Sequence, residues 1–336
     1  MSKRKRMSAV PEAIEALLAG AGSLSTGEVA EAAGVTRQAA HRHLRRFVDE
    51  GRLRAVGAGR TAHYVPAVDL HRVDPLAGLR EDAVWSEVLD EVPALATGTD
   101  AALATDRLAF TEMLNNAIDH SGGSEVEIDV ASDPWFRFRV ADDGVGVFRH
   151  FASRLGLEDD VAAAFELTKG KRTTAPGEHS GEGIFFTSRL VARFRLEANG
   201  LALVVDGSVN DFAIASSSVE RGTTVRWEVD PSTTRRPADV YGDHTDEDLR
   251  FVKTSIPLSV LLGPALVSRA EARRVTDQLE RFEEAEIDFT GVSEVGHAFL
   301  DDLFRVWATR HPGTRLVPVG AAPLIERQIR ALQRRD

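Results

Sequence analysis

Three short segments of this 336-residue chain carry residues whose types and spacing suit the binding of a nucleoside triphosphate. Glu112 and Asn116 stand four residues apart, so on a helix their side chains share one face and can hold a water molecule and a Mg²⁺ ion. Asp142 is followed by glycines at 144 and 146, and Gly181 and Gly183 form the third segment. Glycines let the backbone approach phosphate and base closely. Each segment alone is a weak signal, whereas the three together predict one pocket.

The elements that must position these residues can be read from the apolar pattern. Residues 105–120 have apolar side chains at helical spacing and predict a helix that carries Glu112 and Asn116. Alternating segments predict strands, and one of them runs directly into Asp142. The predicted strands are 126–130, 135–141, 194–198, 201–206 and 223–229. A helix in front of such a sheet indicates an α/β sandwich over residues 100–230, with the ligand lying across the sheet.

The three segments and the order of these elements resemble the GHKL ATPases, most of all the compact anti-sigma-factor serine kinases. The resemblance implies that Glu112 is the general base, that Asn116 binds Mg²⁺, and that Asp142 accepts a hydrogen bond from the adenine amino group of ATP. It also implies nucleotide contacts from Asp119, His120, Gly144, Gly146, Gly181, Gly183 and Thr223.

A long segment, residues 147–181, separates the second motif from the third. It is rich in Gly, Lys and Thr, and it contains Lys169 and Lys171. Such a segment is either a lid over the triphosphate or a loop without a role. The lid interpretation is favoured, because both lysines would then contact the phosphates.

The charge of the chain is unevenly distributed. The whole sequence has a net charge of −11, yet residues 1–64 hold 11 Lys and Arg against 6 Asp and Glu. A basic segment joined to an acidic body is typical of a nucleic-acid-binding domain fused to another function.

Residues 1–66 predict three helices followed by two strands around a glycine-rich wing. Helices fit residues 11–19, 26–33 and 36–49, and the strands lie within residues 53–64. This region resembles the winged helix-turn-helix domains of bacterial transcription regulators. If the third helix enters a major groove, the side chains able to reach DNA are Arg37, Gln38, His41, Arg42, Arg45 and Arg60. The alternative is a small basic domain that contacts proteins.

The remaining segments are a connector and a second α/β region. Residues 67–99 predict a linker and an acidic connector helix, whereas residues 246–336 alternate strand and helix. The segment 287–296 resembles the STAS fold of anti-sigma-factor antagonists, which suggests a protein partner for this region. His297 occupies the register position of the family's phosphorylated Ser, so that phosphoswitch is not carried over. For His297, a structural role as a helix cap is favoured over phosphoacceptance or a contact with the γ-phosphate, with Thr290 and Ser293 as weaker candidates.

Composition limits the compartment and the chemistry. The chain has no cysteine, which excludes disulfides and thiolate ligands. It has no apolar run of about 18 residues and no secretory signal, so we expect a cytoplasmic protein without membrane contact. Because GHKL and winged-helix modules commonly pair, we also expect a homodimer.

The sequence therefore predicts a multi-domain α/β protein with a winged helix-turn-helix, a GHKL α/β sandwich and a STAS-like domain. The leading hypothesis is a transcription regulator in which ATP and Mg²⁺ bias the arrangement of the DNA-binding head and the STAS-like tail. One alternative is an enzyme, either a serine/threonine kinase or a slow ATPase that uses Glu112 as base. Another is an adaptor of a sigma/anti-sigma type network. The sequence leaves open whether ATP is hydrolysed, transferred or only bound.

Overall fold

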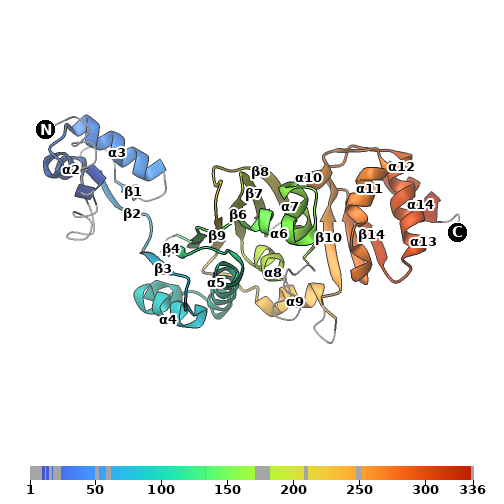
Figure 1. Cartoon of the computed structure of the whole chain (residues 1–336), viewed down its shortest axis with the longest axis horizontal. Coiled ribbons are helices and arrows are strands. Elements are labelled where there is room, and N and C mark those ends of the chain that lie inside the picture. Colours follow the sequence, from blue (N-terminus) through green and yellow to red (C-terminus); the bar gives the residue numbers. More distant parts are fainter. Residues whose placement is uncertain are drawn as a thin grey trace. The chain divides into compact units, whose positions relative to one another are not determined.

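The computed structural model describes residues 10–11, 13–14, 17, 24–49, 53–57, 62–132, 134–170, 182–207, 211–246 and 251–333. Its internal contacts divide the chain into two units (Figure 1). Unit 1 comprises residues 1–71 and 129–133, and unit 2 comprises residues 72–128 and 134–336.

Unit 1 contains two adjacent helices followed by a β-hairpin: α2 (Thr26–Ala32), α3 (Arg37–Asp49), β1 (Leu53–Val56) and β2 (His63–Pro66). Ser25 caps α2 in a capping box with Glu28, and Gly34 takes the positive φ of +63° that the turn to α3 requires. One stripe of α3 is buried, and it packs with residues of α2 and the hairpin into a separate core. The second and third predicted helices and the two predicted strands are present, whereas the wing between the strands and most of the first predicted helix lie outside the described residues.

Most of a seven-stranded sheet belongs to unit 2. Its spatial order is β3-β4-β5-β9-β6-β7-β8. The bounds are β3 (Leu70–Pro75), β4 (Glu125–Ala131), β5 (Phe136–Asp142), β6 (Arg193–Ala198), β7 (Leu201–Asp206), β8 (Asp211–Ser216) and β9 (Thr223–Val229). The predicted strands are all present, whereas β3 and β8 were not predicted. The segment expected to be a linker therefore contributes a strand to this sheet.

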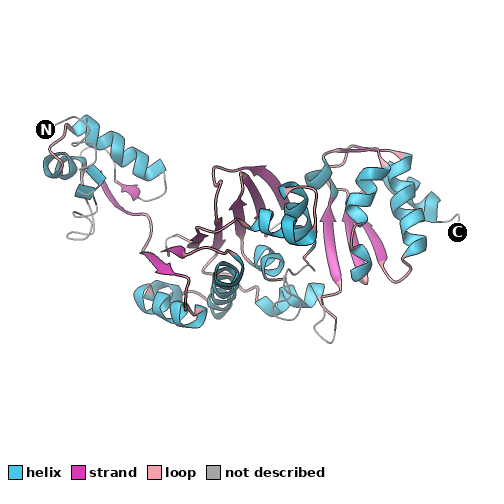
Figure 2. Ribbon diagram, viewed as in Figure 1, coloured by secondary structure: helices cyan, strands magenta, loops and turns pink. Residues whose placement is uncertain are grey.

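Helices cover one face of this sheet (Figure 2). They are α4 (Glu81–Glu91), the 3-10 turn η2 (Pro93–Thr97), α5 (Asp100–His120), α6 (Val147–Leu155), α7 (Asp160–Lys169) and α8 (Gly183–Leu190). Thr99 caps α5 by accepting a hydrogen bond from the Ala102 amide at 3.1 Å. Phe110 of α5 packs edge-on against Phe138 of β5 with centroids 6.1 Å apart, and the Phe138 ring stacks on Trp227 of β9 at 4.9 Å. These contacts hold α5 across the centre of the sheet.

The strands alternate buried apolar residues with residues that are paired on the other face of the sheet. Arg139 binds Glu127 at 3.0 Å, and Glu197 accepts from both Arg195 and Arg226. The alternation explains why the strands could be predicted from the sequence.

The C-terminal region, residues 251–333, has a three-stranded parallel sheet in the order β10-β12-β14. A short helix, α9 (Pro237–His244), precedes it. The other elements are β10 (Lys253–Pro257), α10 (Leu258–Leu262), β11 (Ala265–Leu266), α11 (Arg269–Thr276), η3 (Leu279–Arg281), β12 (Glu284–Asp288), β13 (Glu294–Val295), α12 (His297–Asp301), the π-helical η4 (Asp302–Trp307), α13 (Ala308–Arg310), β14 (Arg315–Val319) and α14 (Pro323–Gln333). This is the alternation of strand and helix that the sequence predicted.

The C-terminal region shares its hydrophobic core with the middle region, which is the part of unit 2 from residue 72 to residue 230. One continuous cluster joins Phe165, Phe185 and Phe186 to residues such as Phe251 and Phe282. None of the helices described is long and apolar enough to cross a membrane.

Candidate nucleotide site

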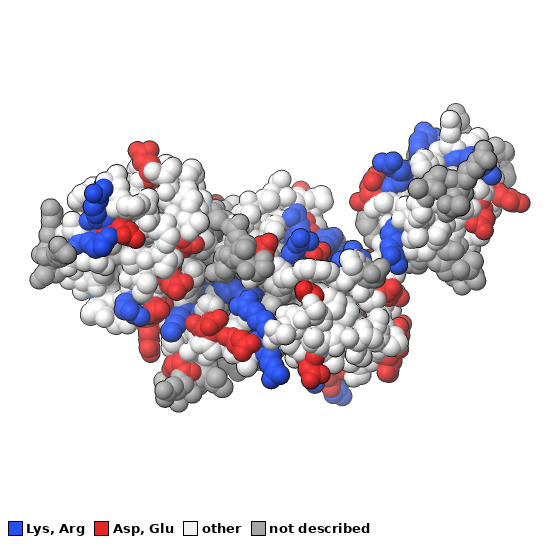
Figure 3. All heavy atoms as spheres, turned by 180° about the vertical axis from the view of Figure 1, so that it is seen from behind, with Lys and Arg blue, Asp and Glu red and all other residues white. Residues whose placement is uncertain are grey.

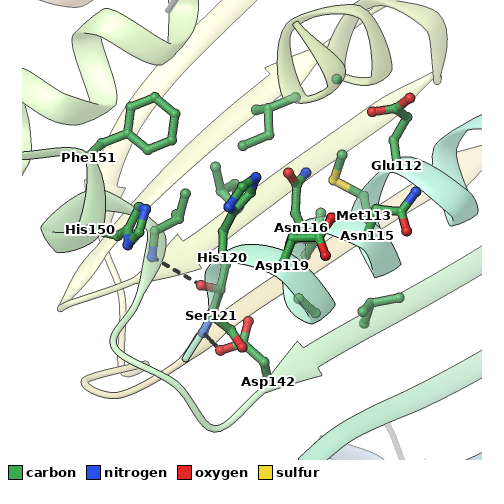
Figure 4. Close-up of a pocket in the computed structure, with 18 residues that line it drawn as sticks. Glu112, Met113, Asn115, Asn116, Asp119, His120, Ser121, Asp142, His150 and Phe151 are labelled. Atoms are coloured by element: carbon green, nitrogen blue, oxygen red, sulfur yellow. Dashed lines mark hydrogen bonds between the residues drawn. The ribbon is translucent and has the colours of Figure 1, made fainter. Parts of the chain in front are cut away.

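A pocket in the middle region lies along one side of α5, between the end of β5 and the starts of α6 and α8 (Figure 4). Glu112 and Asp142 stand toward its two ends, with Asn116, Asp119 and His120 between them along α5. The pocket gathers residues that the sequence places in four distant stretches, namely Glu112, Asn116, Asp119, His120, Asp142, Gly183 and Thr223.

Asp142 forms the end of the pocket nearest to β5. Its Oδ1 accepts backbone hydrogen bonds from Gly144 at 2.9 Å and from Thr223 at 3.2 Å. Both of these bonds use Oδ1, so Oδ2 keeps acceptor capacity for a ligand. Burial raises the pKa of the Asp142 carboxyl above its ordinary value, and the bonds from Gly144 and Thr223 counteract part of that rise. A half-buried acceptor of this kind is suited to binding an amino group.

Glycine is required around Asp142 for backbone packing. A Cβ on Gly144 would lie 2.1 Å from the Ser121 carbonyl oxygen, and one on Gly222 would lie 1.9 Å from the Asp142 carbonyl oxygen. Gly222 also has a φ of +71°. The Thr223 hydroxyl accepts a hydrogen bond from the Val147 amide at 3.0 Å, which ties β9 to the first turn of α6. Gly144 thus makes room for Ser121, the C-cap of α5, and its expected nucleotide contact stays a prediction.

Gly146 is the N-cap of α6 with a φ of +87°, and a Cβ there would lie 2.4 Å from the side-chain amide oxygen of Asn199. Asn199 itself has a positive φ of +53°. Its side chain donates to the Val145 carbonyl at 3.0 Å and accepts from the Arg149 amide at 3.1 Å. Asn199 therefore fixes the loop between β5 and α6.

Glu112 forms the other end of the pocket, beside the first turn of α8. A Cβ on Gly183 would lie 2.1 Å from Glu112 Oε2, so only glycine leaves the carboxylate in this place. The first amides of a helix lack intrahelical partners and carry partial positive charge, which favours an anion near Gly183. The same turn can therefore hold the Glu112 carboxylate or a phosphate oxygen.

Asn116 lies one turn from Glu112, and its Nδ2 is buried without a hydrogen-bond partner among the described residues. A side-chain amide can present nitrogen or oxygen to the same point by rotating, so it suits either a phosphate oxygen or a hard cation. The carboxylates of Glu112 and Asp119 line the same pocket, and oxygen donors of these types are the ligands that Mg²⁺ prefers.

Two histidines face each other in the pocket. The rings of His120 and His150 have centroids 6.0 Å apart. Burial lowers the pKa of His150, and the charges of His120 and Arg154 lower it further. Both imidazoles can donate hydrogen bonds to an anionic ligand.

The structure differs from the prediction at Lys169. This side chain does not line the pocket, because its ammonium group is buried in hydrogen bonds to Glu166 and to two carbonyl oxygens of the C-terminal region. The predicted phosphate contacts of Lys171 and Gly181 lie outside the described residues.

The predicted DNA-contacting residues of unit 1 are exposed on α3. Arg37, Gln38, His41, Arg42 and Arg45 all point away from the buried stripe, and blue Arg side chains are visible on the surface of this unit (Figure 3). The His41 Nδ1 also lies 3.3 Å from the Tyr64 hydroxyl of β2. Arg60 lies outside the described residues.

Comparison with known families gives three matches. Residues 77–206 match the histidine kinase-like ATPase domain. The middle region thus carries the ATPase resemblance that its motifs predicted. Residues 8–67 match the C-terminal domain of the DIP2311-like transcriptional regulators, and residues 271–326 match a STAS-like domain of unknown function (DUF4325). The three predicted resemblances are confirmed. No curated protein matches the chain.

The match of the ATPase-like region begins at residue 77, ahead of the boundary expected at residue 100. In the structure, Trp85 of α4 packs against Phe110 of α5 with centroids 5.4 Å apart, so the expected connector helix is part of this fold. In the STAS-like region, Gly296 is the N-cap of α12 and His297 is its exposed first residue. His297 does not cap the helix.

Residues that sequence reasoning missed act mainly by shaping the ATPase-like pocket. Gly222 and Asn199 hold backbone turns, and His150 contributes a lining side chain. Gly222 precedes Thr223 in a Gly-Thr pair, which was a usable signal. The contact of Asn199 with a loop 50 residues away has no local signature.

Proposed function

We propose that this chain is a cytoplasmic transcription regulator in which ATP and Mg²⁺ bound in the middle region control a DNA-binding head, residues 1–66, and the STAS-like tail. The observation that carries the proposal is the convergence of Glu112, Asn116, Asp142 and Thr223 on one pocket within a histidine kinase-like ATPase region. Nucleotide acts by binding one arrangement of the protein more tightly than another.

The two ends of the pocket suit the two ends of ATP. The half-buried Asp142 carboxylate accepts a hydrogen bond from the adenine amino group. The triphosphate extends along α5 past His120 toward Asn116 and the first turn of α8, where backbone amides and the helix dipole favour negative charge.

The residues around Asn116 fit Mg²⁺ through oxygen donors. Asn116 supplies an amide with no competing partner for its Nδ2 among the described residues, and Glu112 and Asp119 supply carboxylates. A bound Mg²⁺ ion neutralises charge on the phosphates. The chain's own residues orient the nucleotide and exclude water from the adenine end.

The DNA-binding assignment is supported by the match to a transcriptional regulator domain and by the exposed cationic face of α3. We propose that α3 enters the major groove, with Arg37, Arg42 and Arg45 contacting phosphates or base edges.

A second function is favoured by one observation, the position of Glu112. Its carboxylate stands beside Gly183, where the terminal phosphate would meet the start of α8. A carboxylate at that place can take a proton from an attacking water or hydroxyl. The chain would then be a slow ATPase or a serine/threonine kinase.

The experiment that tests the binding function is retention of labelled ATP with Mg²⁺ by the full chain. Wild-type protein is expected to bind, and Asp142→Ala is expected to lose binding because the acceptor for the adenine amino group is removed. Equal binding by the folded Asp142→Ala variant would contradict the proposed orientation of the nucleotide.

A salt series of DNA binding separates the regulator from a protein adaptor. Binding through phosphates must fall steeply as the salt concentration rises, because counterions are released from the DNA. Absence of DNA binding at low salt would leave unit 1 as a protein-contact domain.

A further inference from the structure

Lys169 is the last residue of α7, and it is nearly fully buried at 2% exposure. Its ammonium group donates to Glu166 Oε1 at 2.9 Å, to the Arg274 carbonyl oxygen at 3.1 Å and to the Asp277 carbonyl oxygen at 2.9 Å. An ammonium group has three donors, so all three are used. Two of the three acceptors belong to the C-terminal region.

The two carbonyl groups are at the C-terminal end of α11, where Asp277 is the C-cap. The last carbonyls of a helix have no intrahelical partners, and they carry the negative end of the helix dipole. A buried cation at this position satisfies the carbonyls and is stabilised by them. Lys169 therefore caps a helix of the C-terminal region from a helix of the middle region.

The backbone of the same residue is also held by the C-terminal region. The Thr254 hydroxyl of β10 donates to the Lys169 carbonyl at 2.9 Å, and both residues are buried. The preceding carbonyl, that of Thr168, accepts from Arg189 of α8 at 3.1 Å. The last two carbonyl groups of α7 thus accept one hydrogen bond from β10 and one from α8.

An aromatic layer continues this interface to the helix that begins at the pocket. Phe185 of α8 packs against Phe251 with ring centroids 4.6 Å apart, and Phe186 stacks on Tyr241 of α9 at 4.2 Å. A Cβ on Gly170 would lie 2.6 Å from both Phe185 and Phe251, so the two regions are closely packed at this point. Phe185 and Phe186, which face this aromatic layer, lie within one turn of Gly183 on α8.

We propose that Lys169 fixes the C-terminal region to α7 and α8 as one body, and that nucleotide bound beside Gly183 stabilises α11 through this contact. The partner of this face of the STAS-like region is therefore the middle region of the same chain. The nature of the ligand rests on the proposed function, whereas the contact itself does not.

The first test needs no nucleotide. Amide hydrogen exchange is measured in the full chain for residues 269–277, with residues 323–333 of the same region as internal reference. In Lys169→Met, exchange of 269–277 is expected to rise at least tenfold relative to residues 323–333, because the carbonyl groups lose their donor and the buried Glu166 carboxylate loses its ammonium partner. The melting temperature is expected to fall by about 5–15 °C.

Matched variants separate the contact from general damage. Lys253→Met removes an exposed lysine from neighbouring β10 and should leave exchange unchanged. Glu166→Gln combined with Lys169→Met should recover part of the melting temperature while exchange of 269–277 stays fast. If Lys169→Met does not fold, Thr254→Val removes a single donor and should accelerate exchange in the same direction. Exchange equal to that of Lys253→Met in every folded variant would overturn the proposal.

The second test adds ATP and Mg²⁺ and monitors residues 183–190 at the pocket together with residues 269–277. In wild type, both segments should exchange more slowly than without nucleotide. In Glu166→Gln/Lys169→Met, only residues 183–190 should be protected. Protection of 183–190 alone in wild type would refute the coupling, whereas protection of neither segment would refute nucleotide binding and leave the first test to decide the contact.

Discussion

The substitution Asp142→Asn tests whether Asp142 binds the adenine amino group without disrupting the fold of the pocket. The substitution keeps the size of the side chain and one carbonyl oxygen. That oxygen can still accept from the Gly144 and Thr223 amides, which now bond to Oδ1 at 2.9 and 3.2 Å. The new amide nitrogen then occupies the place of Oδ2, where it presents a donor to the donating adenine amino group.

The expected changes in ATP affinity and in stability follow from the one hydrogen bond that the variant loses and the two that it keeps. A hydrogen bond to a charged acceptor contributes about 1.5–3 kcal/mol, which corresponds to about 10- to 150-fold in affinity. Stability should not fall, because burial raises the pKa of Asp142 and so disfavours the carboxylate in the folded state. A neutral amide removes that cost, and the melting temperature should stay equal or rise.

Isothermal calorimetry with ATP and Mg²⁺, combined with thermal unfolding, measures both effects. The neighbouring Asp143 provides the control, since it lies outside the pocket lining. Its Oδ1 accepts from the backbone amides of Glu125 at 3.0 Å and Ser124 at 2.6 Å, and these bonds lower its pKa to about 2. Asp143→Asn should therefore lower stability and leave ATP affinity within about twofold of wild type.

The opposite pattern would refute this reasoning. If Asp142→Asn binds ATP as tightly as wild type while Asp143→Asn does not, then Asp142 does not contact the base. A lower melting temperature in Asp142→Asn would show that the carboxylate is stabilising where it lies.

Other predictions address chemistry, pH, backbone and DNA. Glu112→Gln should bind ATP within about twofold of wild type, but any phosphate release should slow by about 10²- to 10⁴-fold, and an unchanged rate would remove Glu112 from the chemistry. Burial lowers the pKa of His244 to about 4, so the folded state binds fewer protons than the unfolded state between about pH 6.5 and pH 4. The free energy of unfolding should therefore fall by up to about 3 kcal/mol as pH is lowered through that window, and His244→Phe should flatten this dependence in urea titrations. Gly222→Ala should cost more than about 2 kcal/mol, because the new Cβ meets backbone at 1.9 Å, whereas Gly156→Ala, with nothing within 4 Å, should cost about 1 kcal/mol. Arg42→Gln should weaken DNA binding and reduce the slope of affinity against salt by about one, as measured by gel shift, and an unchanged slope would exclude a phosphate contact.

Sequence patterns predicted the parts of the fold whose signals are local. The helix that carries Glu112 and the strand that ends at Asp142 follow from periodicity, and both lie where they were expected. The segments β3 and β10 are short and contain charged residues and proline, so they resemble linkers in sequence. Their strand character comes from pairing with neighbours in the sheet, which no local pattern encodes.

The sequence predicted several of the side chains that line the pocket. It did not predict the backbone contacts that hold the surrounding elements in place. Spacing of four residues places Glu112 and Asn116 together, and the pocket confirms that they share it. Lys169 shows the limit of prediction from sequence. A lysine near a glycine-rich segment suggests a phosphate contact, but this side chain is held elsewhere. Two of its three partners are carbonyl groups more than 100 residues away, and backbone groups leave no trace in the sequence.

Equilibrium dialysis of the full chain against labelled ATP with Mg²⁺ tests the central claim most directly. Binding of one ATP per chain is predicted, with affinity reduced when Mg²⁺ is removed by a chelator and lost in competition with unlabelled ATP. Equal concentrations of label on both sides of the membrane, for ATP and for ADP alike, would contradict the account.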